Sequence, residues 1–189
     1  MLFGRIIAFA ACTFALAFGA GCGGGNSITR GPQETLPGQA FRSVADVGDF
    51  DSRYDRIESQ VINSPSELER FIAGTDRNDD FGPIPESAPL FMALRASGVD
   101  FDQEALIVLR GTSGGGGYRL VLNRPELEGR TFVSALRTVA TGQGGAAVIS
   151  YRFYVFAVSR ARVDDVRVAV VPAPDTNGIP GTIRLTIPD

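Results

Sequence analysis

Apolar residues follow a helical spacing in one segment of the N-terminal half. Leu68, Phe71 and Ile72 are three and four positions apart, so they share one face of a helix. The preceding Ser-Pro-Ser-Glu at 64–67 combines an N-cap serine, a proline at the first helical position and the glutamate of a capping box. This pattern predicts a helix over residues 65–73.

Two weaker elements flank this helix in the sequence. Ile57, Val61 and Ile62 stand among polar residues and predict a first strand over residues 56–62. A second short helix is predicted over residues 89–96, before Gly98.

From residue 105 onward the apolar spacing becomes that of β-strands. Short runs rich in β-branched and aromatic residues alternate with connections that contain glycine or proline. The predicted strands are residues 105–110, 118–122, 131–141, 146–159, 166–171 and 182–187. This series predicts a mainly β fold, an antiparallel β-sandwich or a partly open barrel with one or two short helices. The predicted core is Ile57, Val61, Leu68, Phe71, Phe101, Leu106, Val108, Leu120, Val148, Tyr151, Phe153, Val155, Val158, Val168 and Val170.

Three of the connections between these strands are candidate partner-binding loops. They are rich in glycine or proline, and such loops can present backbone groups to another protein. The candidate residues are Thr112, Ser113, Gly114, Gly115, Gly116, Gly117 and Tyr118; Gly142, Gln143, Gly144 and Gly145; and Pro172 and Pro174 within residues 172–181.

The first 25 residues have the pattern of an export signal. Arg5 precedes an apolar run over residues 6–18, and three small residues then lead to Cys22. A cysteine directly after the cleavage site resembles a bacterial lipoprotein signal, in which the cysteine is acylated and anchors the protein to a membrane. An ordinary cleaved signal and a retained anchor are the alternatives. The glycines after Cys22, with no adjacent aspartate, favour the outer membrane or the cell surface.

These features divide the chain into three parts. Residues 1–21 are the expected lipoprotein signal peptide, residues 22–40 a flexible tether, and residues 41–189 a single β-rich domain. The net charge is −3 and no basic tract is present, so nucleic acid is not an expected partner.

The side-chain inventory excludes most catalytic chemistry. The chain has no His and no Lys, and its two cysteines are Cys22 and Cys12 within the signal peptide. Histidine-based triads, Ser-Lys dyads and cysteine nucleophiles therefore have no residues to form them. The sequence at 111–115 fits Gly-x-Ser-x-Gly, but that motif requires a following helix and a histidine base. We expect no enzyme activity, no cofactor and no metal.

Acidic residues suggest one alternative to that expectation. The loop 76–80 carries Asp76, Asp79 and Asp80, but it departs from the calcium-loop pattern at its sixth and twelfth positions. A solvated acidic loop is the favoured interpretation. A calcium site, or a carboxylate-dependent enzyme, is the least favoured hypothesis.

Two family resemblances indicate a function for the loops. The sequence 98–102 (Gly-Val-Asp-Phe-Asp), the strand at 106–109, Gly111 and the Gly-Gly-Tyr at 116–118 resemble the C-terminal domain of PrcB-type subunits. The namesake of that family is a lipoprotein-like accessory component of a surface protease complex. The resemblance covers residues 57–170 and implies a non-catalytic lipoprotein that assists the assembly or stability of an envelope or secreted protease.

A second resemblance is to chagasin-like inhibitors of cysteine proteases, which place three loops at one end of an Ig-like sandwich. Gly117-Tyr118, the Gly-Gln-Gly-Gly at 142–145 and the Pro-Ala-Pro at 172–174 match those loops in position. The chain has no Trp for the third loop. Protease inhibition is therefore the second hypothesis, and a purely structural envelope lipoprotein or a small-molecule binder remains a further alternative.

Overall fold

The computed structural model describes residues 39–49, 52–74, 84–114, 117–142, 149–174, 176 and 178–188. In chain order the elements are β1 (Phe41–Asp49), the 3-10 helix η1 (Ser52–Arg56), β2 (Gln60–Ile62), α1 (Pro65–Gly74), α2 (Pro89–Arg95), β3 (Glu104–Ser113), β4 (Tyr118–Leu122), β5 (Glu126–Glu128), β6 (Thr131–Ala140), β7 (Ser150–Ser159), β8 (Asp165–Val171) and β9 (Gly181–Thr186). The expected mainly β fold with two short helices is confirmed.

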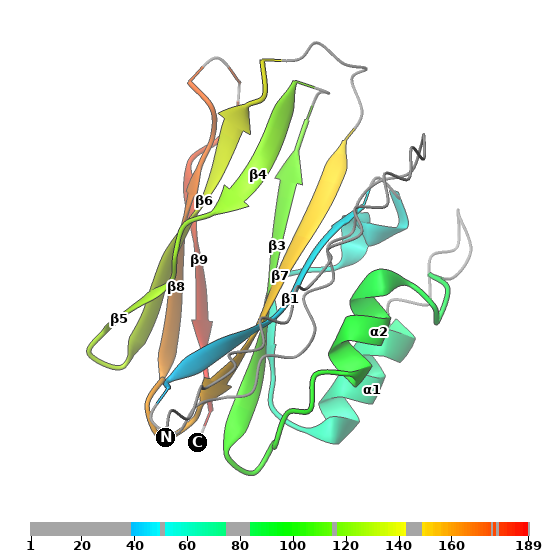
Figure 1. Cartoon of the computed structure of the whole chain (residues 1–189), viewed down its shortest axis with the longest axis vertical. Helices are drawn as coiled ribbons and strands as arrows, with labels where there is room; N and C mark the ends of the chain where they lie inside the picture. The colour runs from blue at the N-terminus through cyan, green and yellow to red at the C-terminus, as the bar shows by residue number, and fades with distance from the viewer. Residues whose placement is uncertain are drawn as a thin grey trace, which may run out of the picture.

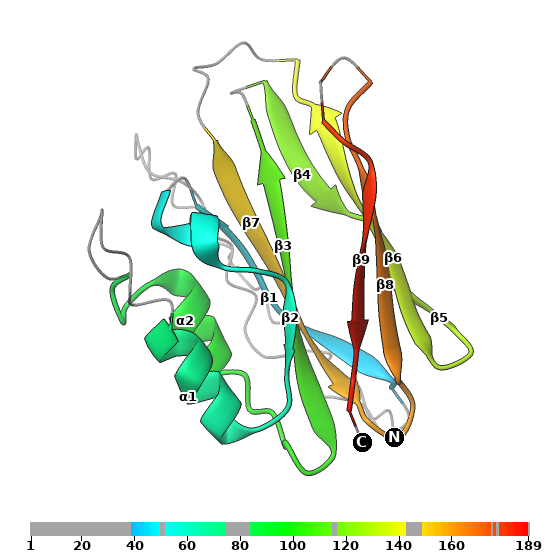
Figure 2. The same ribbon diagram turned by 180° about the vertical axis from the view of Figure 1, so that it is seen from behind.

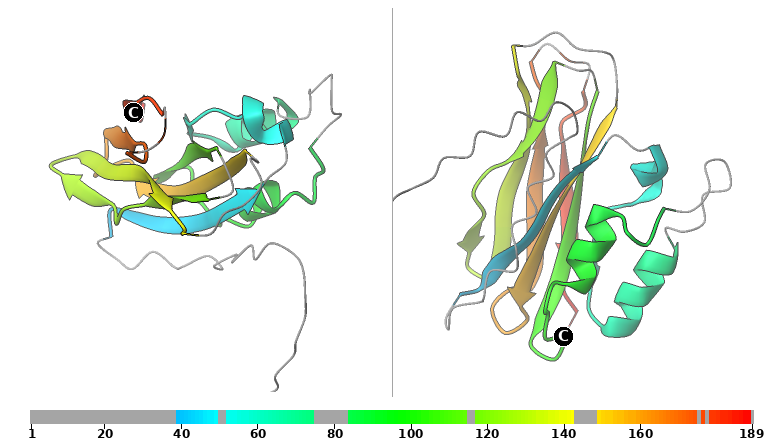
Figure 3. Two further views of the ribbon diagram at one scale, coloured as in Figure 1. Left: turned by 90° about the horizontal axis from the view of Figure 1, so that it is seen from above. Right: turned by 45° about the vertical axis from the view of Figure 1, so that its right-hand side comes forward.

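The strands form two sheets that pack face to face as a sandwich (Figure 1). Sheet A has the order β1-β7-β3-β2, and sheet B has the order β4-β6-β8-β9 with β5 paired to β6. Seen from behind, β2 and β9 form neighbouring edges of the two sheets (Figure 2). The helices α1 and α2 cover the face of sheet A that points away from sheet B (Figure 3).

One strand pair departs from the expected antiparallel pattern. β6 and β8 are parallel, with Phe132 opposite Val166 and Leu136 opposite Val170. The chain leaves sheet B after β6, runs back through sheet A as β7, and re-enters sheet B as β8 in its original direction. The sequence does not reveal this because the alternation of apolar residues is the same in both orientations.

Two apolar cores hold the three layers together. Between the sheets, Phe132, Phe156 and Phe41 form a cluster of tilted and edge-to-face rings with centroids 5.1 to 6.4 Å apart. On the helix side, Phe71 and Phe91 pack against the other face of sheet A. Sheet A is buried on both faces, which explains the unbroken burial of residues 105–109 and 153–158. Of the predicted core, Val61, Phe101 and Val170 are half-buried, Val148 is not among the described residues, and the rest are buried.

The capping residues of α1 act as the sequence indicates. The Glu67 N–H donates to Ser64 Oγ at 3.1 Å, and the Glu67 carboxylate accepts the N–H of Asn63 at 2.7 Å. The helix extends to Gly74, one residue beyond the prediction.

The prediction was wrong for the first strands. β1 was missed, although it forms eight residue pairs with β7. The strand expected at residues 56–62 is only Gln60–Ile62, because Arg56 belongs to η1 and residues 57–59 connect η1 to β2. Tyr54 and Ile57 are both buried in the helix-side core, which turns this segment away from the sheet. The three-residue strand β5 was also missed.

An arginine that the sequence did not single out fixes β1. Arg42 is buried, and its guanidinium donates to the carbonyl of Ser97 at 3.0 Å and to Glu104 Oε2 at 3.1 Å. It therefore joins β1 to the end of α2 and to the start of β3.

Candidate functional site

Three connections between strands lie at one end of the sandwich, which we call the loop end. β3, β6 and β8 all end there, and β4, β7 and β9 all begin there (Figure 1). The β3–β4 and β6–β7 connections each cross from one sheet to the other, and the β8–β9 connection stays within sheet B. The described loop-end residues are Gly114, Gly117, Thr141, Gly142, Ile149, 172–174, Thr176 and 178–180. The structure thus brings together the three loops that the sequence indicated.

The first candidate loop is shorter than predicted. Thr112 and Ser113 are the last residues of β3, and Tyr118 is the first of β4, so these three belong to strands. Ser113 is buried, and its Oγ lies 2.8 Å from Ser150 Oγ on β7. Ser113 therefore supports the loop end from within and is not available to a partner. Gly114 and Gly117 are in the connection, and Gly115 and Gly116 lie outside the described residues.

The second candidate loop is partly described. Thr141 donates its N–H to the carbonyl of Gly117 at 2.7 Å, which ties the second connection to the first. Gly142 is exposed and follows directly. Gln143, Gly144 and Gly145 lie outside the described residues.

The third candidate loop, between β8 and β9, contains a turn at Ala173. The Ala173 carbonyl accepts the N–H of Thr176 at 3.1 Å and its hydroxyl at 2.8 Å. A Cβ at Gly178 would lie 2.6 Å from Pro172 Cβ, so only glycine fits this close approach. Pro172 is half-buried and Pro174 is exposed, so Pro174 is the more accessible of the two candidates.

Two exposed isoleucines at the loop end were not singled out from the sequence. Ile179 is 86% exposed and Ile149 is 53% exposed. Covering a large exposed apolar side chain with another protein lowers the free energy. The available indication in the sequence was their position, each within or next to a connection rich in glycine or proline.

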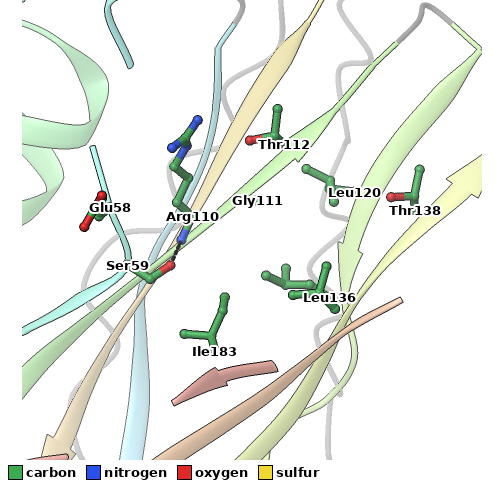
Figure 4. Close-up of a pocket in the computed structure, with 10 residues that line it drawn as sticks. Glu58, Ser59, Arg110, Gly111, Thr112, Leu120, Leu136, Thr138 and Ile183 are labelled. Carbon is green, nitrogen blue, oxygen red and sulfur yellow. Dashed lines mark hydrogen bonds between the residues drawn. The ribbon is translucent and has the colours of Figure 1, made fainter. Parts of the chain in front are cut away.

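A cavity of about 370 Å³ opens between the sheets on the side of β2 and β9 (Figure 4). Its walls are apolar toward sheet B, where Leu120, Leu136, Val170 and Ile183 line it, and Thr138 adds a hydroxyl. On the other side it is bordered by residues 110–112 of β3 and by residues 58–59.

A second cavity, of about 480 Å³, lies at the opposite edge, between β1, β7 and the segment after β4. The Arg152 guanidinium donates two hydrogen bonds to Asp46, at 2.6 and 2.8 Å. The Tyr154 hydroxyl donates to the Leu120 carbonyl at 3.2 Å and accepts the N–H of Leu122 at 3.1 Å. Burial raises the pKa of Tyr154 above its ordinary value. These polar groups already have protein partners: the Arg152–Asp46 pair joins β7 to β1 within sheet A, and the Tyr154 hydroxyl joins sheet A to sheet B.

No metal centre is assembled within the described ranges, where no three or more His, Cys, Asp or Glu side chains form a group that could hold an ion. The acidic loop 76–80 falls outside those ranges. Asp100 accepts the N–H of Asp102 at 3.1 Å in the turn before β3. Asp164 is paired with Arg130, which lowers its pKa.

Among the helices of the described segments, none has the length and apolar character needed to cross a membrane. Comparisons with protein-family models, with curated proteins and with solved structures found no match in any of the three. The two family resemblances therefore stay predictions, and the functional argument rests on the geometry of the loop end.

Proposed function

We propose that this protein is a non-catalytic binding module, anchored to the cell envelope through acylated Cys22, that binds a protein partner with its loop end. The observation that carries the proposal is the exposure of Ile149 and Ile179 where three connections converge. Two large exposed apolar side chains among converging connections give this end of the sandwich an apolar surface, which supports a protein-binding role. The rigid sandwich beneath positions the loops, which is the usual arrangement of binding loops on β-folds.

The proposed partner is an envelope or secreted protein, and the resemblance to PrcB-type domains makes it a protease that this module assists. The side-chain inventory supports a non-catalytic role, because a chain without His or Lys has few groups that exchange protons near neutral pH.

Protease inhibition is the second candidate function. The convergence of three connections at one end of a sandwich is the arrangement of chagasin-like inhibitors, and it favours this alternative. Assistance and inhibition require the same surface, so the sign of the effect on protease activity separates them.

The test compares three single variants of the full chain, expressed in the organism that encodes it. Ile149→Asp and Ile179→Asp each place a charge on the loop end. Met92→Asp is the matched control, because Met92 is 54% exposed but lies on α2. Proteins that bind are captured by crosslinking in intact cells and identified by mass spectrometry.

We expect one envelope protein to be recovered with the wild type and the Met92 variant, and to be reduced about tenfold in both isoleucine variants. Its activity is then measured with and without the purified module. Increased activity or stability identifies an accessory subunit, and reduced turnover identifies an inhibitor. Equal recovery with all three variants would refute the loop end as the binding surface.

The anchor has its own test. Mass spectrometry of the N-terminal peptide should show acyl chains on Cys22, and Cys22→Ser should release the protein from the membrane fraction. An unmodified Cys22 in membrane-bound protein would refute the lipoprotein assignment and favour a retained anchor.

A further inference from the structure

Sheet A is incomplete along one edge. β2 pairs only with Leu106, Ile107 and Val108 of β3, whereas β3 continues to Ser113. The chain leaves this edge at Ser59, whose Oγ accepts the N–H of Arg110 at 2.9 Å. On the β2 side of residues 110–113, the described part of the chain places no strand beside β3.

Within the described part of the chain, this edge offers unpaired backbone groups. Backbone groups of successive residues in a strand point alternately to its two sides. Since the Arg110 N–H points toward the side of β2, the N–H and C=O of Thr112 point to that side as well. No hydrogen bond to these two groups is found among the described residues. An edge of this kind can pair with a strand from another chain.

The cavity of about 370 Å³ lies directly beside this edge (Figure 4). A longer β2 would cover the inner face of sheet B here, but its early end leaves Leu136, Val170 and Ile183 along the cavity wall. Gly111 faces the cavity and has no side chain to fill it. A Cβ at Gly111 would lie 3.0 Å from Leu120 Cδ1, so larger residues are disfavoured there.

We propose that this edge binds an extended segment of the partner protein, which adds to sheet A as a strand antiparallel to β3 and in line with β2. This inference rests on the proposed function, because it describes how the same partner is held. Thr112 and Ser113, the last residues of β3, lie at the loop end. A partner that covers the loop end can therefore continue along this edge.

The geometry also defines the chemistry of the segment. A residue opposite Gly111 directs its side chain into the cavity, because residues that face each other across a pair of strands share one side of the sheet. The apolar wall selects a Val, Ile, Leu or Phe at that position. The neighbouring residues of the segment point to the other side, where Arg110 lies.

Arg110 provides a hydrogen-bond donor on that other side. Its guanidinium is held by Asp55 at 2.8 Å and lies 5.2 Å from the centre of the Tyr151 ring. Its Nε is buried and finds no hydrogen-bond partner among the described residues. A buried donor without an acceptor is unfavourable, so an acceptor on the bound segment would relieve this cost. The expected segment therefore alternates an apolar residue with residues that carry side-chain oxygens.

An extended peptide fits these features better than other occupants. A helix or a small apolar molecule would leave the backbone groups of Thr112 unpaired. A second copy of the chain, or another segment of the same chain, is distinguished by the experiment.

The probe is a phage-displayed library of random dodecapeptides, selected on the immobilised full chain in mild detergent. Backbone amide exchange is then measured by NMR on the uniformly ¹⁵N-labelled protein, with and without the best synthetic peptide. We expect selected peptides to alternate apolar and polar residues. We also expect the Thr112 amide to exchange quickly in the free protein and at least tenfold more slowly with peptide.

Two variants separate backbone pairing from other contacts. Thr112→Pro removes the unpaired N–H without removing a hydrogen bond of the sheet, and proline is tolerated at such an edge position. Thr112→Val is the matched control, since it keeps the N–H and changes the side chain. Peptide affinity should fall at least tenfold for the proline variant and less than threefold for the valine variant.

A second pair of variants covers the case in which Thr112→Pro does not fold. Ile183→Phe fills the cavity, and Thr182→Phe places the same ring on the other face of β9. Only Ile183→Phe should weaken peptide binding.

The proposal fails if the selection does not enrich alternating peptides, or if the proline and valine variants bind the peptide with equal affinity. It also fails if the Thr112 amide exchanges slowly in the free, monomeric protein, because slow exchange would show that the chain covers its own edge. A dimer in solution that dissociates in the proline variant would assign the edge to a second copy. If the isoleucine variants lose the cellular partner while Thr112→Pro retains it, the proposed function stands and strand addition fails.

Discussion

Replacing Tyr154 with Phe is the most direct test of how the two sheets are joined. Tyr154 lies on β7 of sheet A, and its hydroxyl bonds to two backbone groups of β4 in sheet B, the Leu120 carbonyl and the Leu122 N–H. Tyr154→Phe keeps the ring and removes only this connection. Both backbone groups then lose a partner, at a cost of about 1–3 kcal/mol for a buried group.

We expect Tyr154→Phe to lower the free energy of unfolding by about 2 kcal/mol at pH 7, since Leu122 is half-buried and water can satisfy its N–H in part. For a domain of this size the melting temperature should fall by roughly 4–8 °C. The assay is urea denaturation followed by circular dichroism, with the slope m compared between the proteins. Tyr151→Phe is the control on the same strand. Its hydroxyl faces the exposed Asp55, so its loss should cost less.

The same variant tests the pKa of Tyr154. Burial raises the pKa of the Tyr154 hydroxyl in the folded protein above its unfolded value of 10.0. The folded state then binds the proton more tightly, so this contribution to stability is complete below pH 10 and is lost as the pH rises through the folded pKa. The difference in stability between the wild type and Tyr154→Phe should therefore narrow above pH 10. A variant within about 0.5 kcal/mol of the wild type at pH 7, with the same m, would refute this account of the contact between the sheets.

Three further predictions concern ties elsewhere in the fold. Ser64→Ala removes the N-cap of α1 and should cost about 1 kcal/mol in urea denaturation, whereas Ser66→Ala should cost less; equal costs would contradict the capping geometry. Arg42→Met should lower the free energy of unfolding by about 3 kcal/mol or more, because it removes the buried ion pair with Glu104. The double variant Arg42→Met/Glu104→Met should recover much of this loss. A single variant as stable as the wild type would exclude this role of Arg42. The pKa of Asp164 is lowered below 3.8 mainly by its hydrogen bond with Arg130, so its contribution to stability is complete above that value and is lost as the pH falls through the folded pKa. Asp164→Asn should therefore be less sensitive to acid than the wild type between pH 4 and pH 2, and identical acid transitions would contradict the pairing.

The strongest sequence patterns were reliable for local reasons. The cap at residues 64–67 and the apolar face of α1 act within one helix, so a single short segment contains the full information. The long strand β7 could also be predicted, because its β-branched and aromatic residues are continuous. By contrast, β1 contains Ser43, Asp46 and Gly48 and lacks a clear alternation. It becomes a strand because β7 offers it a full edge and because Arg42 finds partners far along the chain.

The candidate site, like the fold, could be predicted only in part from the sequence. The glycine- and proline-rich connections could be identified from composition, and their convergence followed once the strands were arranged as a sandwich. Ile149 and Ile179 could not be identified, because an isoleucine near a strand is ordinarily a core residue. Their exposure depends on where each strand ends, which the periodicity of the sequence locates only to within a few residues.

The sequence alone determined the class of fold, the two helices and the narrow range of chemistry, because periodicity, caps and side-chain inventory are properties of short segments or of the whole composition. The tertiary structure alone decided the parallel pairing of β6 with β8, the early end of β2 and the edge of β3 that no described strand covers. Each of these depends on competition between distant segments for one place in a sheet. Tyr54 and Ile57 lie in the helix-side core, and that packing leaves the edge and its cavity open.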